Sequence, residues 1–212
     1  MNKSIIIING HPAAGKTTFA IQLSRELKIP YLVKNTFKNA LGASMAVNNQ
    51  GESSRLSATT FDAIVYVAER LMEVGKPLII EGSFSAHEFI KDDGTRKVNE
   101  SAIIKELIDK YDYQPLTYIF TGDTLILHKR FLEREKLNER GLSAIIGEMT
   151  YEYFDKICQH QEKFDIGGKL IKIDTTDFEK VDFASLIETV KMFIECPLLG
   201  LTAGSSLTVD KF

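Results

Sequence analysis

Cysteine is scarce in this chain of 212 residues, which has only Cys158 and Cys196. The two stand far apart, and neither belongs to a Cys-x-x-Cys pair or to a Cys/His spacing that would bind a metal ion. Because the rest of the chain has the character of an intracellular protein, we expect two reduced thiols rather than a disulfide.

Long hydrophobic segments are lacking as well. The apolar run near the start of the chain is Ile5–Ile8, and these four residues are too few for a signal peptide or a membrane span. We therefore expect a cytoplasmic protein without a membrane partner.

Positive charge is not in excess, because 26 Lys and Arg stand against 29 Asp and Glu, which gives a formal net charge of −3. Such a balance provides no overall attraction to nucleic acid or to an anionic membrane, although it does not exclude a local basic patch. Nucleic acid is therefore not an expected partner.

Apolar residues, in contrast, are plentiful: 44% of the chain is hydrophobic, and 13 residues are Phe. A chain of this length can bury one sizeable core. We expect a single domain over residues 1–196, followed by a C-terminal tail, 197–212, that packs or frays.

Segments typical of strands alternate with segments typical of helices along the chain. The β-branched run 4–9 fits a strand buried on both faces, and helical spacing of apolar residues begins at Lys16. Further strands are expected at 31–33, 77–81, 115–120 and 170–173, and further helices at 36–46, 57–74, 99–111, 124–138, 149–164 and 178–194. The polar stretch 48–54 is typical of a loop. This alternation predicts an α/β fold, with a parallel sheet of about five strands and helices on both faces.

A phosphate-binding motif of the form Gly-x4-Gly-Lys-Thr lies between the first predicted strand and the first predicted helix, which is the context that supports it. Its residues are Gly10, His11, Pro12, Ala13, Ala14, Gly15, Lys16 and Thr17, followed by Thr18. The glycines allow backbone N–H groups to converge on phosphate oxygens at the positive end of a helix. Lys16 is expected to reach the β- and γ-phosphates, and the Thr17 hydroxyl to bind Mg²⁺.

Three further segments follow the motif in an order that resembles small P-loop kinases. They are Lys-Asn-Thr-Phe-Lys at 34–38, Ile-Glu-Gly at 80–82, and Tyr-Ile-Phe at 118–120 before an arginine-containing helix. The group they resemble contains the polynucleotide 5′-kinases, the zeta toxins and the chloramphenicol phosphotransferases. The resemblance implies the three-layer sandwich of P-loop NTPases, transfer of the ATP γ-phosphoryl group to a hydroxyl, and a mobile lid at about 122–147.

Two arginines of the expected lid, Arg130 and Arg134, lie four residues apart and share a helix face. They could converge on the charge that spreads over the transferring phosphate oxygens. The alternative is a solvent-exposed helix with ion pairs, because Glu133 and Glu135 are interleaved with the arginines.

Glu81 stands at the carboxyl end of a predicted strand, where open α/β sheets place groups that contact ligands. It could hold a Mg²⁺-bound water or accept the proton of the acceptor hydroxyl, and the alternative is a structural carboxylate. The resemblance also places the adenine near the loop after the last strand, which assigns Thr176 to the nucleotide site.

The resembling kinases carry a catalytic Asp where this chain has Asn35. An amide cannot take up a proton, although it can orient a hydroxyl. Either Glu81 or Asp62 is the base, or positioning and electrostatics suffice without a strong base, or the protein transfers phosphate poorly. Lys34 and Lys38 flank this position and suggest an anionic acceptor, although ordinary surface lysines are an equal alternative.

Together these features predict an ATP- and Mg²⁺-dependent kinase that acts on a small-molecule or nucleoside-type acceptor. The alternatives are a nucleotide-binding protein without efficient transferase activity and a nucleotide or polynucleotide end-kinase, which would need a basic groove. The acceptor, the preference for ATP over GTP and the oligomeric state stay open.

Overall fold

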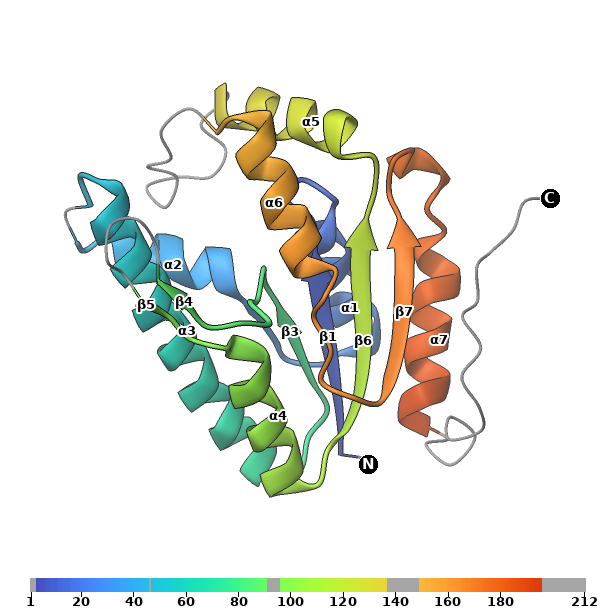
Figure 1. Ribbon diagram of the computed structural model, residues 1–212. Coiled ribbons are helices and arrows are strands. Elements are labelled where there is room, and N and C mark those ends of the chain that lie inside the picture. Colours follow the sequence, from blue (N-terminus) through green and yellow to red (C-terminus); the bar gives the residue numbers. More distant parts are fainter. Residues whose placement is uncertain (1–2, 46, 91–95, 137–148, 196–212) are drawn as a thin grey trace.

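The computed structural model describes residues 3–45, 47–90, 96–136 and 149–195 (Figure 1). The expected C-terminal tail and residues 137–147 of the expected lid lie outside these ranges. The extent of the domain, 1–196, therefore stays a prediction. Among the described residues, no helix is long and apolar enough to cross a membrane.

A parallel sheet of five strands, in the order β2-β3-β1-β6-β7, forms the centre of the molecule. The strands are β1 (Ser4–Gly10), β2 (Tyr31–Val33), β3 (Leu78–Glu81), β6 (Gln114–Thr121) and β7 (Lys169–Asp174). β1 occupies the middle of the sheet, and all seven of its residues are buried. The predicted α/β fold is confirmed, and because the strands are parallel their carboxyl ends meet at one edge of the sheet.

Helices cover both faces of the sheet, and α5 lies across the edge where the strands end (Figure 1). The helices are α1 (Lys16–Leu27), α2 (Lys34–Gly42), α3 (Gln50–Glu73), α4 (Glu100–Tyr111), α5 (Thr124–Lys136), α6 (Tyr151–Gln161) and α7 (Phe183–Glu195). Two short strands, β4 (Phe89–Ile90) and β5 (Arg96–Lys97), form a separate antiparallel pair.

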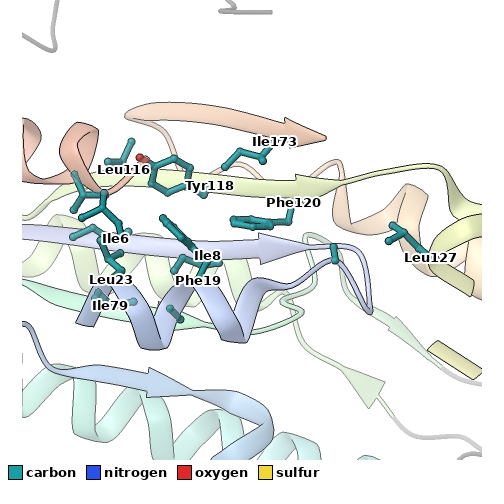
Figure 2. Close-up of a cluster of buried hydrophobic side chains, with 14 of the residues drawn as sticks. Ile6, Ile8, Phe19, Leu23, Ile79, Leu116, Tyr118, Phe120, Leu127 and Ile173 are labelled. Carbon is teal, nitrogen blue, oxygen red and sulfur yellow. The ribbon is translucent and has the colours of Figure 1, made fainter. Parts of the chain in front are cut away.

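One face of the sheet buries α1 and α7. Ile6 and Ile8 of β1 pack with Phe19 of α1 (Figure 2). The centroid of the Phe19 ring lies 5.4 Å from the ring centroids of both Tyr118 and Phe120 on the neighbouring strand. Replacing a buried Phe by Ala costs about 3–5 kcal/mol. This cluster therefore fixes α1, and with it the end of the phosphate-binding loop, against the sheet.

The opposite face buries α3 and α4. Ile5 and Ile7 alternate with the residues of the first face, as the pleat of a strand requires, and pack with Phe61 of α3 and Ile104 of α4. β1 is thus apolar on both faces, which explains why its sequence is a continuous apolar run rather than an alternating one.

The polar stretch 48–54 is not the predicted loop, because α3 begins at Gln50 rather than at 57. The Asn49 side chain accepts a hydrogen bond from the Glu52 backbone N–H at 2.9 Å. The Glu52 carboxylate in turn accepts from the Asn48 backbone N–H at 2.7 Å. These reciprocal caps satisfy donors at the helix start, so a polar composition here begins a helix instead of interrupting one.

The last predicted helix, 178–194, is divided into two elements. A short 3₁₀ turn, Phe178–Lys180, comes first, and α7 starts only at Phe183. The Asp182 carboxylate accepts a hydrogen bond from the Ser185 backbone N–H at 3.0 Å and so caps the helix. The turn places Phe178 beside Gly15 of the phosphate-binding loop.

Candidate functional site

The phosphate-binding loop connects β1 to α1, as its sequence predicts, and two glycines shape it. Gly10 has a φ of 123°, and a Cβ there would lie 2.1 Å from the Phe120 carbonyl oxygen. Gly15 has a φ of 82° and precedes α1. No side chain caps this helix. Its first N–H groups are therefore left for an anionic ligand, which the helix dipole also favours.

Lys16 folds back over the loop. Its ammonium nitrogen donates to the carbonyl oxygens of Gly10 at 2.8 Å and His11 at 2.6 Å, and the residue is 7% exposed. The cation is thus held at the centre of the loop by neutral acceptors. A phosphate anion is a stronger partner for an ammonium group than a carbonyl oxygen, so Lys16 is placed to exchange one for the other.

Glu81 lies beside Thr17, although 64 positions separate them in the sequence. The Thr17 hydroxyl donates to a Glu81 carboxylate oxygen at 3.1 Å, because β3 pairs with β1 and brings Glu81 opposite Ile8. Glu81 is 1% exposed, and this burial raises the pKa of its carboxyl above the usual value, while Lys16, Thr17 and Arg134 oppose the rise.

The Thr17–Glu81 pair fits a magnesium ion carried by a nucleotide. Mg²⁺ takes oxygen ligands and is usually bound through one or two protein groups together with phosphates and waters. A hydroxyl and a carboxylate in contact beside Lys16 supply that donor set. In the part of the chain that the structure describes, no group of three or more His, Cys, Asp or Glu side chains could hold a metal ion alone. The nucleotide would therefore have to contribute ligands.

Arg130 is bound to the loop that follows β7. Its two terminal nitrogens donate to the backbone carbonyl oxygens of Thr175 at 2.8 Å and Thr176 at 2.6 Å. The Thr176 hydroxyl also donates to Asp174 at 2.6 Å and accepts from the Asp123 backbone N–H at 2.8 Å. Thr176 therefore stabilises the wall of the site, and the Arg130 guanidinium is held in a fixed plane.

A cleft of about 530 Å³ lies between the phosphate-binding loop, α5 and the loop after β7. Its lining residues are Ala13, Gly15, Thr18, Arg130, Arg134, Asp177, Phe178 and Glu179. The structure thus brings Arg130 and Arg134 together with the phosphate-binding loop. The planar guanidinium of Arg130 in this cleft is suited to a nucleobase, since such a group stacks on flat rings.

Phe178, Asp177 and Glu179 are cleft residues that the sequence reasoning missed. They follow Thr176 directly, so their position after the last strand was the only signal for them. The Phe178 ring covers Gly15 so closely that a Cβ on Gly15 would lie 2.0 Å from its Cε2 atom. The Phe178 ring also packs against Phe183, with ring centroids 5.6 Å apart and an angle of 83° between the ring planes.

The lysines expected at the acceptor side are both engaged by protein groups. Lys34 is 5% exposed and forms an ion pair with buried Glu100. Lys38 donates to the Ser53 hydroxyl at 2.8 Å. Asn35, between them, is exposed at the start of α2. Of the three residues expected to contact an acceptor, Asn35 is therefore the most accessible.

His11 connects the phosphate-binding loop to Glu162, the residue that follows α6. Its Nε2 atom lies 2.9 Å from a Glu162 carboxylate oxygen, and its backbone N–H donates to the Phe120 carbonyl at 2.8 Å. Burial lowers the pKa of the imidazole, although Glu162 opposes this effect. The side chain therefore anchors the loop at the C-terminal end of α6.

No protein-family model and no curated protein matches the chain. Solved structures do. A suspected kinase from Chloroflexus aurantiacus J-10-fl has a TM-score of 0.76 at 23% identity, over 91% of this chain and 98% of that one. The APS kinase of Mycobacterium tuberculosis, solved with AMPPNP and APS, has a TM-score of 0.55 at 12% identity, over 92% and 98%. A gluconokinase from Sinorhizobium meliloti has a TM-score of 0.52 at 11% identity, over 93% and 97%.

None of these three structures is described as a polynucleotide kinase, a zeta toxin or a chloramphenicol phosphotransferase, so that narrower resemblance stays a prediction. Their likeness nevertheless extends over nearly the whole of both chains in each comparison. The chain has the fold of P-loop kinases.

Proposed function

We propose that the protein is an ATP- and Mg²⁺-dependent kinase that transfers the γ-phosphoryl group to a hydroxyl of a small molecule. The observation that carries the proposal is the convergence of Lys16, Thr17 and Glu81 at the carboxyl end of the central strands. The structural neighbours support it, because the APS kinase was solved with an ATP analogue and its small-molecule acceptor, and a gluconokinase is also among them.

Each part of the donor site has an assigned role in this proposal. The backbone of residues 10–17 binds the phosphates, and Lys16 leaves its two carbonyl partners to contact the β- and γ-phosphates. Thr17 and Glu81 hold Mg²⁺, which when bound neutralises charge on the phosphate oxygens. The fixed guanidinium of Arg130 forms one wall for the nucleobase.

Arg134 is assigned to the phosphates rather than to the base. It lines the same cleft as Arg130, one helical turn further along α5, and it lies close enough to Glu81 to oppose the rise that burial causes in the pKa of that carboxyl. A guanidinium near both the cleft and the magnesium side can stabilise the negative charge that spreads over the transferring group.

Proton removal from the acceptor takes place without a carboxylate base at position 35. The acceptor oxygen attacks the γ-phosphorus, the bond to the β–γ bridging oxygen breaks with its electron pair passing to ADP, and the hydroxyl proton passes to an oxygen of the transferred phosphoryl group and from there to water. Asn35 cannot take this proton, and Glu81 is engaged by Thr17 on the magnesium side. We therefore assign Asn35 to orienting the hydroxyl. The acceleration then comes chiefly from positioning and charge stabilisation, which suits a loose transition state.

A nucleotide-binding protein without transferase activity is the second candidate. The specific observation in its favour is Asn35, an exposed amide where a kinase of the resembling group carries a carboxylate. An end-kinase acting on nucleic acid has less support, because the net charge of −3 offers no general attraction to a polyanion.

A transfer screen distinguishes the three candidates. The protein is incubated with Mg²⁺ and γ-labelled ATP in the presence of APS, sugars, sugar acids, nucleosides or oligonucleotides, and Lys16→Met is the inactive control. The proposal expects label on a small molecule with wild type only. Label on oligonucleotides alone would favour the end-kinase. The binding protein would be favoured if wild type bound ATP tightly but transferred no label, and if Asn35→Asp transferred label.

A further inference from the structure

A buried ion pair joins the first residue of α2 to the first residue of α4. Lys34 is 5% exposed and Glu100 is 3% exposed, and the ammonium of one contacts the carboxylate of the other. Two rings enclose the cation, since the Lys34 nitrogen lies 5.2 Å from the centroid of Phe61 and 5.4 Å from that of Phe84. No solvent-facing ligand is needed to satisfy this lysine.

The second carboxylate oxygen of Glu100 holds the segment that follows β3. It accepts a hydrogen bond from the Ser85 backbone N–H at 3.0 Å. The Ser85 hydroxyl donates to the Val98 carbonyl at 2.7 Å, and the Ser85 carbonyl accepts from the Ser101 N–H at 3.0 Å. Three hydrogen bonds therefore attach Ser85 to the N-terminal end of α4 and the residues before it.

Residue Asn9, on the central strand, holds the same segment from the other side. Its side chain accepts from the Phe84 backbone N–H at 3.0 Å and donates to the Phe84 carbonyl at 3.5 Å. Phe84 is fully buried. Residues 82–85 are thus fixed from β1 and α4, and through Glu100 they are connected to Lys34 at the start of α2.

Stability alone does not account for the buried ion pair. A buried ion pair contributes little net stability, because the cost of desolvating both charges offsets their attraction, and apolar side chains of similar volume often serve as well. What the pair does supply is a defined distance between two backbone segments. A Cβ built on Gly82 would lie 3.1 Å from the Cβ of Lys34, which shows how close these segments run.

Two residues with roles in the proposed mechanism are attached to this network: Glu81, which holds Mg²⁺, and Asn35, which orients the acceptor hydroxyl. Glu81 directly precedes the fixed segment, and Asn35 directly follows Lys34. We propose that the Lys34–Glu100 pair is a positioning device that fixes Asn35 relative to Glu81, and that Lys34 makes no contact with the acceptor. This inference rests on the proposed kinase function.

A consequence concerns the class of acceptor. Lys34 and Lys38 beside Asn35 suggested an anionic acceptor on sequence grounds, but the charge of Lys34 is neutralised by Glu100 inside the protein. Loss of the pair should therefore impair anionic and neutral acceptors alike. It should lower kcat through misplacement of Asn35, and it should not raise the KM of anionic acceptors selectively.

The test uses the double variant Lys34→Met/Glu100→Gln, in which the Gln oxygen can still accept from the Ser85 N–H. The matched control is Lys105→Met/Asp109→Asn, which removes an exposed pair on α4. We expect wild-type affinity for MgATP in calorimetry. We also expect amide hydrogen exchange to be at least 10-fold faster in residues 82–86 and 34–38 and unchanged in α1. In the control variant, exchange in residues 82–86 and 34–38 should equal that of wild type.

Kinetics with the acceptor that the transfer screen identifies completes the test. A displacement of about 1 Å costs up to about 100-fold in rate, so we expect kcat to fall 10- to 100-fold with KM changed less than 3-fold. Lys34→Arg, which keeps the charge, should recover part of this loss. Unchanged kcat, or a rise of KM confined to anionic acceptors, would overturn the inference.

The exchange measurement separates this inference from the proposed function. If wild type transfers no label to any acceptor, the kinase proposal fails on its own evidence. Unchanged exchange in residues 82–86 and 34–38 of the folded double variant would show that the pair fixes nothing, whether or not the protein is a kinase.

Discussion

The contact between Gly15 and Phe178 allows a quantitative prediction for the phosphate-binding loop. In Gly15→Ala the new Cβ would lie 2.0 Å from Phe178 Cε2 and 2.8 Å from Cζ. Overpacking of this kind costs about 1–3 kcal/mol. The φ of 82° adds a left-handed strain of about 1–2 kcal/mol for any residue with a Cβ. We expect the free energy of unfolding to fall by about 2–5 kcal/mol in total.

A double-mutant cycle in urea isolates the steric part. Phe178→Ala removes the ring, so Gly15→Ala in that background should retain only the backbone strain, and the cycle should give a coupling energy of about 1–3 kcal/mol. Gly75→Ala is the control, because Gly75 has a φ of 72° but no atom within 4 Å of a built Cβ. It should lose about 1–2 kcal/mol, with no rescue by Phe178→Ala.

The outcome that would refute this reasoning is additivity. If the two changes add within about 0.5 kcal/mol, Phe178 does not press on the loop.

Two further predictions concern residues near the loop. Glu81 has a pKa raised by burial above its ordinary value of 4.5, so the folded state binds more protons than the unfolded state and stability falls as pH rises through that raised pKa. Glu81→Gln should unfold at a higher temperature than wild type at pH 7, and this difference should shrink at pH 4. An equal difference between the two proteins at pH 4 and pH 7 would contradict it. Asn9→Leu should lose about 1–3 kcal/mol in urea unfolding, because it leaves the buried Phe84 N–H without a partner. A loss below about 0.5 kcal/mol would show that this bond does not hold residues 82–85.

Much of the fold could be predicted from local sequence, because its strands are buried on both faces and therefore appear as short apolar runs. The run at Ile5–Ile8 predicted β1, and the motif at 10–17 predicted the loop between strand and helix. The start of α3 was missed, since a capped helix end and a polar loop have the same composition around Asn49 and Glu52.

Contacts between distant residues could not be predicted in this way. Lys34 and Glu100 are 66 positions apart, and His11 and Glu162 are 151 apart. The two contacts depend on how loops and helices meet at the end of the sheet, which no local pattern records. Helical spacing predicted that Arg130 and Arg134 share a face of their helix, but no local pattern records that the Arg130 guanidinium donates to the carbonyl groups of Thr175 and Thr176.

Calorimetric titration of MgATP into wild type and Lys16→Met tests the central claim most directly. Removing a charged contact to phosphate should weaken binding at least about 10-fold, which corresponds to about 1.4 kcal/mol. Titration without Mg²⁺ should weaken binding to wild type as well, because Thr17 and Glu81 then lack the ion that connects them to the phosphates. Equal affinity of the two proteins for MgATP would contradict the assignment of residues 10–17 to the phosphates, and with it the proposed function.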